Sequence, residues 1–205
     1  MTRYSVSNSA IVVVDVQNDF CHPDGYQSRL GRDVTRTHGA VSRLTELLDA
    51  ARVVDVPIVL MRNEHDSSAA SAEWLDRHSV AREIESCAVG SWGAEFFRLE
   101  PQPGDIVLSK SRYSAFVGSQ LEPVLRRLGR TSLFFCGVTT SICVESSLRD
   151  AVCRDFFGTL VEDCCGDYSE AVHLGAMSSV SGGFGRVLSA PAVLAAWSEH
   201  RADGT

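Results

Sequence analysis

Three residues with complementary chemistry each stand at the end of an apolar segment. Asp15 follows "SAIVVV", Lys110 ends "GDIVLSK", and Cys143 lies in "GVTTSICVESSLRD", directly after "SLFFC". A cysteine thiol has an ordinary pKa of about 8.5, so only a small part of it is nucleophilic thiolate at neutral pH. Because a carboxylate can accept the thiol proton and a lysine ammonium stabilises both anions, this set predicts covalent catalysis at a carbonyl carbon.

Each of these residues also has an ordinary structural explanation. An aspartate can cap a turn, most lysines lie on solvated surfaces, and unpaired cysteines are often buried. Cys143 is distinguished by its position at the start of a segment with helical spacing. The free N–H groups of such a helix end favour a thiolate and could bind a developing oxyanion. The hydroxyl groups of Thr139, Thr140 and Ser141 could cap this helix.

Alternating strands and helices are the elements that would hold these residues. Continuous apolar runs predict strands buried on both faces, and segments with helical spacing follow most of them. The predicted strands are "SAIVVVDV", "VPIVLM", "GDIVLSK", "SLFFCG", "GTLVEDC" and "GRVLSA". Residues 62–103 are irregular, with short helical pieces around Trp74 to Ile84. We therefore expect one domain over residues 1–205, an α/β fold with three αβα layers and a six-stranded, mostly parallel, Rossmann-like sheet.

Parallel strands gather their carboxyl ends at one edge of the sheet, where ligands bind in open α/β folds. Asp15, Lys110 and Cys143 all follow such strand ends. The fold class therefore predicts that these three side chains meet.

The composition excludes several classes of function. The 205 residues are 44% hydrophobic and 22% charged, with a net charge of −7 and no basic cluster. This argues against nucleic acid or an anionic membrane as a partner. No apolar run approaches the roughly 18 residues of a membrane span, and the N-terminus lacks a signal-peptide core, so we expect a cytoplasmic protein. Seven scattered cysteines without a C-x-x-C pair predict neither a disulfide framework nor a structural zinc site.

Three segments together resemble the isochorismatase-like cysteine hydrolases. They are "IVVVDVQNDF" at 11–20, "VLSKSRYSAF" at 107–116 and "GVTTSICVESSLRDA" at 137–151. The resemblance implies a catalytic triad of Asp15, Lys110 and Cys143. It also implies a cis peptide between Val138 and Thr139, with the N–H groups of Thr139 and Cys143 forming the oxyanion hole. No cofactor is implied, and family members are usually homodimers or homotetramers.

The branches of this family differ in their chemistry. The nucleophilic cysteine argues against the vinyl ether cleavage of true isochorismatases. Nicotinamidases carry a metal-binding Asp-x-His, whereas "RNEHDSS" holds His65 and Asp66 at the wrong spacing, so we predict no metal and expect the histidines to be surface groups. The ureidoacrylate and biuret amidohydrolases look closest, also through "GSW" at 90–92. A small ureido, carbamoyl or amide substrate is therefore expected.

Several alternatives stay open. A hydrolase of a cyclic amide, similar to streptothricin hydrolases, or a nicotinamidase-like amidase would use the same triad. A non-catalytic binding module or a redox sensor built on Cys143 would need neither Asp15 nor Lys110. Cys164 and Cys165 replace small residues that the family resemblance would suggest, in a region that could shape the substrate pocket.

Five further residues are candidates for substrate binding, because they flank Asp15 and Lys110 or end the second strand. Flat, polar substrates need ring faces to confine them and a few donors to orient them. For Arg112, pairing with a structural carboxylate is an equal alternative. The candidates are Phe20, Asn63, Arg112, Tyr113 and Phe116.

Overall fold

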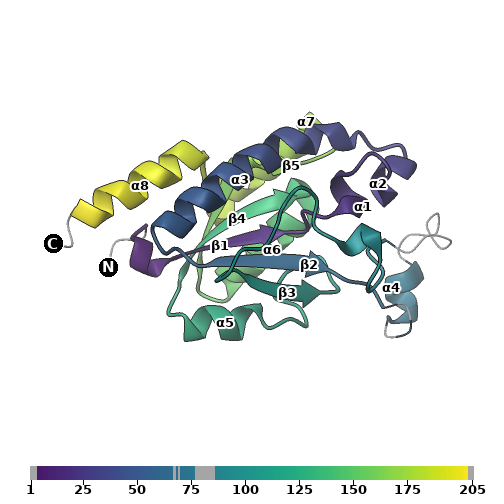
Figure 1. Cartoon of the computed structure of the whole chain (residues 1–205), viewed down its shortest axis with the longest axis horizontal. Coiled ribbons are helices and arrows are strands. Elements are labelled where there is room, and N and C mark those ends of the chain that lie inside the picture. Colours follow the sequence, from purple (N-terminus) through teal and green to yellow (C-terminus); the bar gives the residue numbers. More distant parts are fainter. Residues whose placement is uncertain (1–3, 67, 69, 77–85, 203–205) are drawn as a thin grey trace.

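A single parallel sheet forms the centre of the molecule. The computed structural model describes residues 4–66, 68, 70–76 and 86–202. Within them, six strands pair in the order β3-β2-β1-β4-β5-β6, and every ladder is parallel (Figure 1). The predicted fold class is confirmed, with a sheet that is parallel throughout. The strands are β1 (Ser9–Val14), β2 (Ile58–Asn63), β3 (Ile106–Lys110), β4 (Ser132–Val138), β5 (Phe157–Gly166) and β6 (Arg186–Leu188).

Helices cover both faces of this sheet. The long helix α3 and the C-terminal helix α8 lie together on one side, and α5 lies on the other (Figure 1). Helix α6 packs with α5 in the second core. The α-helices are α1 (Asn18–Cys21), α2 (Tyr26–Arg29), α3 (His38–Val53), α4 (Ala72–Asp76), α5 (Leu121–Arg127), α6 (Glu145–Cys153), α7 (Glu170–Ser179) and α8 (Ala190–Ala202). Shorter turns are η1 (Val6–Asn8), η2 (Val34–Thr37) and η4 (Trp92–Ala94), with π-helical turns η5 (Thr140–Val144) and η6 (Val180–Phe184).

Strand β1 shows why the central strands appear in the sequence as continuous apolar runs. Its residues alternate between the two cores: Ile11 and Val13 pack with α3 and α8, and Val12 and Val14 pack with α5 and α6. All six residues of the strand are buried. Since successive side chains of a strand point to opposite faces, a strand covered on both sides favours apolar residues at nearly every position, as from Ala10 to Val14.

The strand order reverses between β1 and β4. The chain passes from β1 outward to β2 and β3, whereas β4 leads to β5 and β6 on the other side. Such a reversal leaves a crevice beyond the carboxyl ends of the two strands. Val14 pairs with Gly137, so the segments that follow β1 and β4 leave the sheet side by side.

The region predicted to be irregular packs across this edge. It contains α4 and η4, and an isolated antiparallel bridge joins Phe96 to Gln17. The helical pieces predicted around Trp74 to Ile84 correspond to α4 at their start, while residues 77–85 lie outside the described part of the chain.

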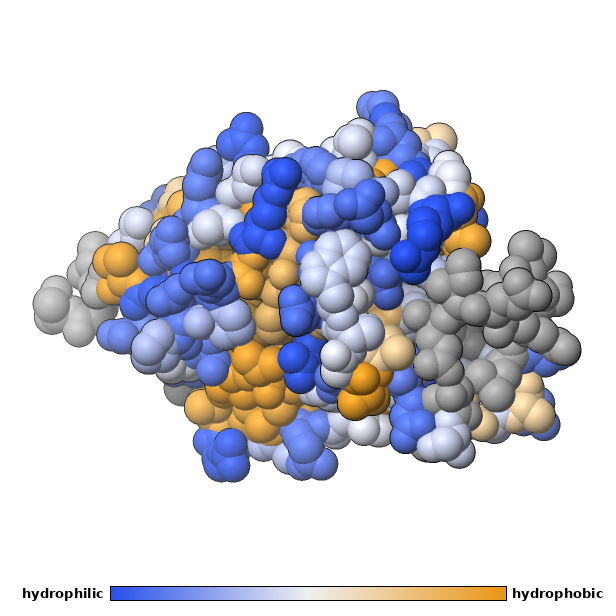
Figure 2. All heavy atoms as spheres, turned by 45° about the vertical axis from the view of Figure 1, so that its right-hand side comes forward, coloured by the Kyte–Doolittle hydropathy of each residue, from blue (hydrophilic) through white to orange (hydrophobic). Residues whose placement is uncertain are grey.

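Hydrophilic side chains cover much of the face seen in Figure 2, with an apolar area between them. Among the described residues, no helix combines the length and the apolar character needed to cross a membrane.

Candidate active site

A buried ion pair lies at the centre of the site. Asp15 follows β1 directly and adopts a left-handed backbone conformation, with φ 55°, which aspartate tolerates better than most residues. Lys110 is the last residue of β3, and its Nζ lies 2.7 Å from Oδ2 of Asp15. Both side chains are almost fully buried, at 0% exposure for Lys110 and 1% for Asp15. The Lys110 Nζ also donates to the carbonyl oxygen of Arg112 at 2.9 Å, which fixes the ammonium in place.

Cys143 joins this pair from the opposite half of the sheet. It lies in the π-helical turn η5 between β4 and α6, and the residue is partly exposed. Single π-helical turns are rare and occur frequently at functional sites. The charges of Asp15 and Lys110 both act on the Cys143 thiol. The structure therefore brings together the three residues that the sequence singled out.

Burial and the neighbouring charges shift the pKa values of Asp15, Lys110 and Cys143. Burial raises the pKa of Asp15, while the charge of Lys110 and hydrogen bonding to Lys110 and Cys143 counteract this effect. Burial lowers the pKa of Lys110, but the charge of Asp15, the hydrogen bond to Asp15 and the nearby Cys143 sulfur together raise it by more, so the net pKa is raised. Burial and then the charge of Asp15 raise the pKa of Cys143, against the opposing effect of Lys110. The resting thiol is therefore protonated at neutral pH and needs a neighbouring base to react.

The close approach of β1 and β4 depends on Gly137. This residue has φ 116°, and a Cβ placed on it would lie 2.1 Å from the carbonyl oxygen of Val14. The second peptide bond after Gly137, between Val138 and Thr139, is cis. Thr139 is buried directly after it and accepts hydrogen bonds on its carbonyl oxygen from the N–H groups of Ile142 and Val144. The oxyanion hole at Thr139 and Cys143 stays a prediction.

Helix α6 is tied to the segment that follows Lys110. The Ser147 hydroxyl donates to the carbonyl oxygen of Cys143 at 2.6 Å and accepts the N–H of Ala115 at 2.9 Å. Ser114 donates to Asp150 Oδ2 at 2.7 Å. Two of the three motifs recognised in the sequence are thus joined through hydroxyl groups, which restrains Cys143 relative to Lys110.

Two polar residues of the first motif have structural roles that the sequence analysis did not assign. The buried Gln17 donates to the carbonyl oxygens of Asn63 and Ala94 at 2.9 and 2.8 Å, and it accepts the N–H of Asn63 at 2.7 Å. The buried Asp19 accepts the N–H of Cys87 at 2.7 Å. Two polar residues directly after a buried strand could have indicated a structural role. Their partners could not be predicted, because they are distant in the sequence.

Arg112, Tyr113 and Asn63 lie in one connected group beside the ion pair. The Arg112 guanidinium stacks on the Trp74 ring at 4.3 Å, and the rings of Trp74 and Tyr113 are 5.1 Å apart. The guanidinium donates to the Ser111 carbonyl oxygen and pairs with no carboxylate of the described residues. Asn63 lies 3.0 Å from His65, measured between Nδ2 and Nε2. A cation and aromatic rings therefore adjoin the segment that carries Lys110.

The two phenylalanine candidates pack against the two hydrophobic cores, and their role in substrate binding stays a prediction. Phe20 is partly buried and packs against the core beneath α3 and α8. Phe116 is buried in the other core, where its ring centroid lies 5.8 Å from that of Phe156. Cys164 and Cys165 are buried in the two cores, one on each face of the sheet. They pack there as small side chains, and the Cys165 thiol also donates to the carbonyl oxygen of Phe135 at 3.5 Å.

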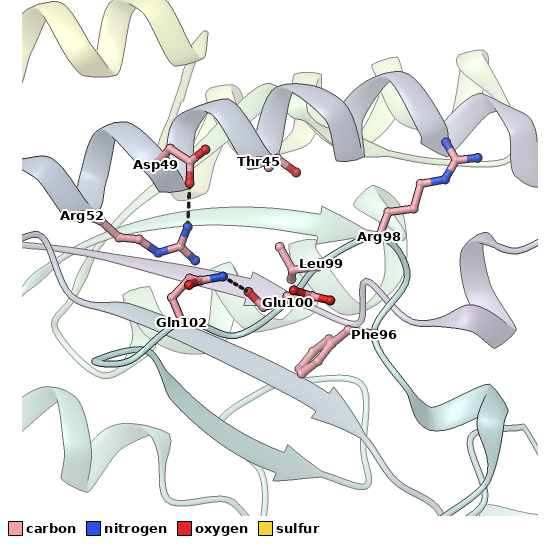
Figure 3. Close-up of a pocket in the computed structure, with 8 residues that line it drawn as sticks. All are labelled: Thr45, Asp49, Arg52, Phe96, Arg98, Leu99, Glu100 and Gln102. Carbon is pink, nitrogen blue, oxygen red and sulfur yellow. Dashed lines mark hydrogen bonds and ion pairs between the residues drawn. The ribbon is translucent and has the colours of Figure 1, made fainter.

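A cavity of about 550 Å³ lies elsewhere, between α3 and the segment 96–102 (Figure 3). Arg52 binds Asp49 there at 2.8 Å and Asp105 at 2.7 Å, so its charge is already compensated. The cavity contains none of the predicted site residues, and its lining is Thr45, Asp49, Arg52, Phe96, Arg98, Leu99, Glu100 and Gln102.

Three of the histidines make contacts with neighbouring side chains. His22 and His38 pack against Phe97, and Nδ1 of His173 lies 2.8 Å from the Thr140 hydroxyl. All three residues are partly exposed, so they lie at the surface as expected while their rings also contact neighbouring side chains. Within the described part of the chain, no three His, Cys, Asp or Glu side chains gather in a way that could hold a metal ion. Hydrolysis without a metal stays a prediction.

Comparisons with known proteins agree with this architecture. The Isochorismatase domain family matches residues 9–192. The ureidoacrylate amidohydrolase RutB of Azorhizobium caulinodans is 37% identical over 173 residues, which are 78% of this chain and 76% of that protein. The corresponding RutB of Methylobacterium radiotolerans is 35% identical over 192 residues, covering 86% and 74% of the two chains.

Solved structures share the fold over nearly the whole chain. A cysteine hydrolase from Pseudomonas syringae superposes with a TM-score of 0.87 at 24% identity, covering 98% of this chain and 97% of that one. An N-carbamoylsarcosine amidase from Thermoplasma acidophilum superposes with a TM-score of 0.71 at 25% identity, covering 89% and 96%. The family match, the sequence relatives and the shared sheet lead to one conclusion: this chain belongs to the isochorismatase family of hydrolases.

Proposed function

We propose that this protein is a cysteine-dependent amidohydrolase that cleaves the C–N bond of a small ureido or carbamoyl compound through a thioester intermediate. The observation that carries the proposal is the buried Asp15–Lys110 ion pair beside a partly exposed cysteine. The relatives named ureidoacrylate amidohydrolase and N-carbamoylsarcosine amidase support this class of substrate.

In the first half of the reaction, Asp15 accepts the proton of the Cys143 thiol as the sulfur attacks the substrate carbonyl carbon. The N–H groups of Thr139 and Cys143 hold the resulting oxyanion. When the intermediate collapses, the C–N bond breaks and Asp15 returns its proton to the leaving nitrogen. The acyl or carbamoyl group then remains on the sulfur.

In the second half, Asp15 accepts a proton from water as the water attacks the thioester. The C–S bond breaks, the product acid leaves, and the sulfur regains a proton from Asp15. Lys110 keeps its charge throughout, because its ammonium is held by Asp15 and by the Arg112 carbonyl oxygen. The positive charge of Lys110 stabilises the Asp15 carboxylate and the Cys143 thiolate, whichever of them is present at each step.

The proposed substrate is compact and carries a carboxylate. Arg112 supports this assignment, since its guanidinium lies flat on Trp74 and has no carboxylate partner among the described residues. A planar guanidinium recognises a carboxylate with two parallel hydrogen bonds. The ring faces of Trp74 and Tyr113 suit a flat ureido group.

The nucleophile is tested by Cys143→Ala, with ammonia release as the assay. We expect turnover to vanish while the melting temperature stays close to that of the parent. Cys153→Ala is the matched control, because Cys153 is exposed at the end of α6 and should be dispensable. A Cys143→Ala protein with near-parental turnover would refute the scheme.

The substrate class is tested by comparing kcat/KM for ureidoacrylate, biuret, an N-carbamoyl amino acid, nicotinamide and a cyclic lactam. A clear preference for nicotinamide or the lactam would contradict the proposal. Arg112→Gln should raise KM roughly 10-fold for the acids, about the effect of one charged hydrogen bond, and leave biuret unaffected. Arg98→Gln is the control, because Arg98 also lies over an aromatic ring, that of Phe97.

A further inference from the structure

The segment after β5 contains a buried carboxylate with no part in the proposed chemical steps. Asp167 is 8% exposed and accepts three hydrogen bonds. Its Oδ2 accepts the backbone N–H of Ser141 at 3.0 Å and the Ser141 hydroxyl at 2.7 Å, and its Oδ1 accepts the N–H of Tyr168 at 2.8 Å. Both oxygens are therefore occupied by donors from two adjoining segments.

Ser141 belongs to the turn that carries the nucleophile. It lies two residues before Cys143 in η5, where the N–H groups of Ile142 and Val144 both donate to one carbonyl oxygen, that of Thr139, at 3.2 Å. The carboxylate of Asp167 supplies a stronger restraint from outside, because hydrogen bonds to a charged acceptor are stronger than neutral ones.

A second side chain from beyond β5 contacts the η5 turn. The Thr140 hydroxyl lies 2.8 Å from Nδ1 of His173 in α7. Two successive residues of η5 are thus held by side chains from the segment after β5. This segment also reaches the other half of the site, since the Tyr168 hydroxyl donates to the carbonyl oxygen of Phe20 at 3.0 Å.

We propose that Asp167 is a positioning residue that fixes Cys143 relative to Asp15 by holding the η5 turn through Ser141. The substrate used to measure its effect rests on the proposed function. Asp167 lies beyond the end of β5, beside the crevice where the segments after β1 and β4 emerge. From that place it restrains the sulfur without touching the reacting atoms.

Asp167→Ala tests this role by removing all three bonds. A misplacement of about 1 Å can cost on the order of 100-fold in rate, so we expect kcat to fall by that order with a smaller change in KM. Asp167→Asn keeps one acceptor for Ser141 and should lose less than Asp167→Ala. Ser141→Ala keeps the backbone bond, removes the hydroxyl bond, and should lower kcat roughly 10-fold.

Asn8→Ala is the matched control at the opposite end of the sheet. Asn8 is 7% exposed, and its Oδ1 accepts both the N–H and the hydroxyl of Thr131, at 3.2 and 2.6 Å. We expect a comparable loss of melting temperature and a kcat within about 2-fold of the parent. Equal kcat losses in Asn8→Ala and Asp167→Ala would reduce Asp167 to a general stabilising residue and overturn the proposal.

A second readout does not depend on turnover. Alkylation of Cys143 by iodoacetamide is followed by mass spectrometry of its peptide, which separates it from the exposed Cys153. If Asp167 holds the thiol beside its base, alkylation at pH 6–7 should slow at least several-fold in Asp167→Ala and stay unchanged in Asn8→Ala. Unchanged alkylation and kcat in Asp167→Ala would overturn the inference. Failure of the parent protein to hydrolyse any ureido compound would instead refute the proposed function, while the alkylation comparison still decides the role of Asp167.

Discussion

Replacing Lys110 with methionine leaves the Asp15 carboxylate buried without its counter-ion. The two groups are 2.7 Å apart and at most 1% exposed, so solvent cannot take over the role of the ammonium. Removing one partner of such a pair costs about 3–5 kcal/mol. The carboxyl can limit this cost by taking up a proton, and the cost of that protonation depends on pH.

The free-energy cost of protonating Asp15 is calculated from the ordinary aspartate pKa of 3.8. At about 1.36 kcal/mol per pH unit, protonating the carboxyl costs about 4 kcal/mol at pH 7 and about 1.6 kcal/mol at pH 5. In Lys110→Met the pKa of Asp15 is higher in the folded state than in the unfolded state. Stability is therefore lost as the pH rises from the unfolded-state pKa to the folded-state pKa. The variant should therefore be destabilised by about 4 kcal/mol at pH 7, and by clearly less at pH 5.

Urea denaturation at both pH values measures this effect. The double variant Asp15→Asn/Lys110→Met carries no buried charge and should be more stable at pH 7 than Lys110→Met alone. Arg36→Met is the control, because its ion pair with Glu170 is exposed and should contribute under about 1 kcal/mol. A loss in Lys110→Met that is the same at pH 5 and pH 7, together with additive effects in the double variant, would refute the reasoning.

Four further results are expected. The acid side of the kcat/KM profile should have its midpoint above pH 3.8, because burial raises the pKa of Asp15; a midpoint at or below 3.8 would contradict this. Dialysis against a chelator should leave turnover unchanged, whereas loss of activity with release of stoichiometric zinc or iron would not fit. We propose a homodimer or homotetramer, which light scattering at micromolar concentration should detect, and a monomer there would exclude it. Burial lowers the pKa of His173, so stability should fall as pH drops below 6.5, and His173→Gln should flatten this dependence of the melting temperature.

That Asp15, Lys110 and Cys143 lie close together could be predicted from local patterns. Strands of a parallel sheet are buried on both faces, so they appear in the sequence as continuous apolar runs whose ends are easy to find. Their carboxyl ends share one edge, and Asp15, Lys110 and Cys143 all follow such ends. Continuous apolar runs for strands and a 3.6-residue period for helices are therefore enough to predict from the sequence alone that these residues meet.

The partners of individual side chains could not be predicted in this way. Ser141 and Asp167 are 26 residues apart, and Gln17 and Ala94 are 77 apart, so no local pattern relates them. The same holds for Phe116, which closely follows Lys110 in the sequence while its ring packs on Phe156 in the core. A turn can direct neighbouring side chains to opposite sides, and the choice between pocket and core depends on which distant residues fill the space. That choice is made by close packing of the whole chain, because each buried polar group must find a hydrogen-bond partner and each ring must find room.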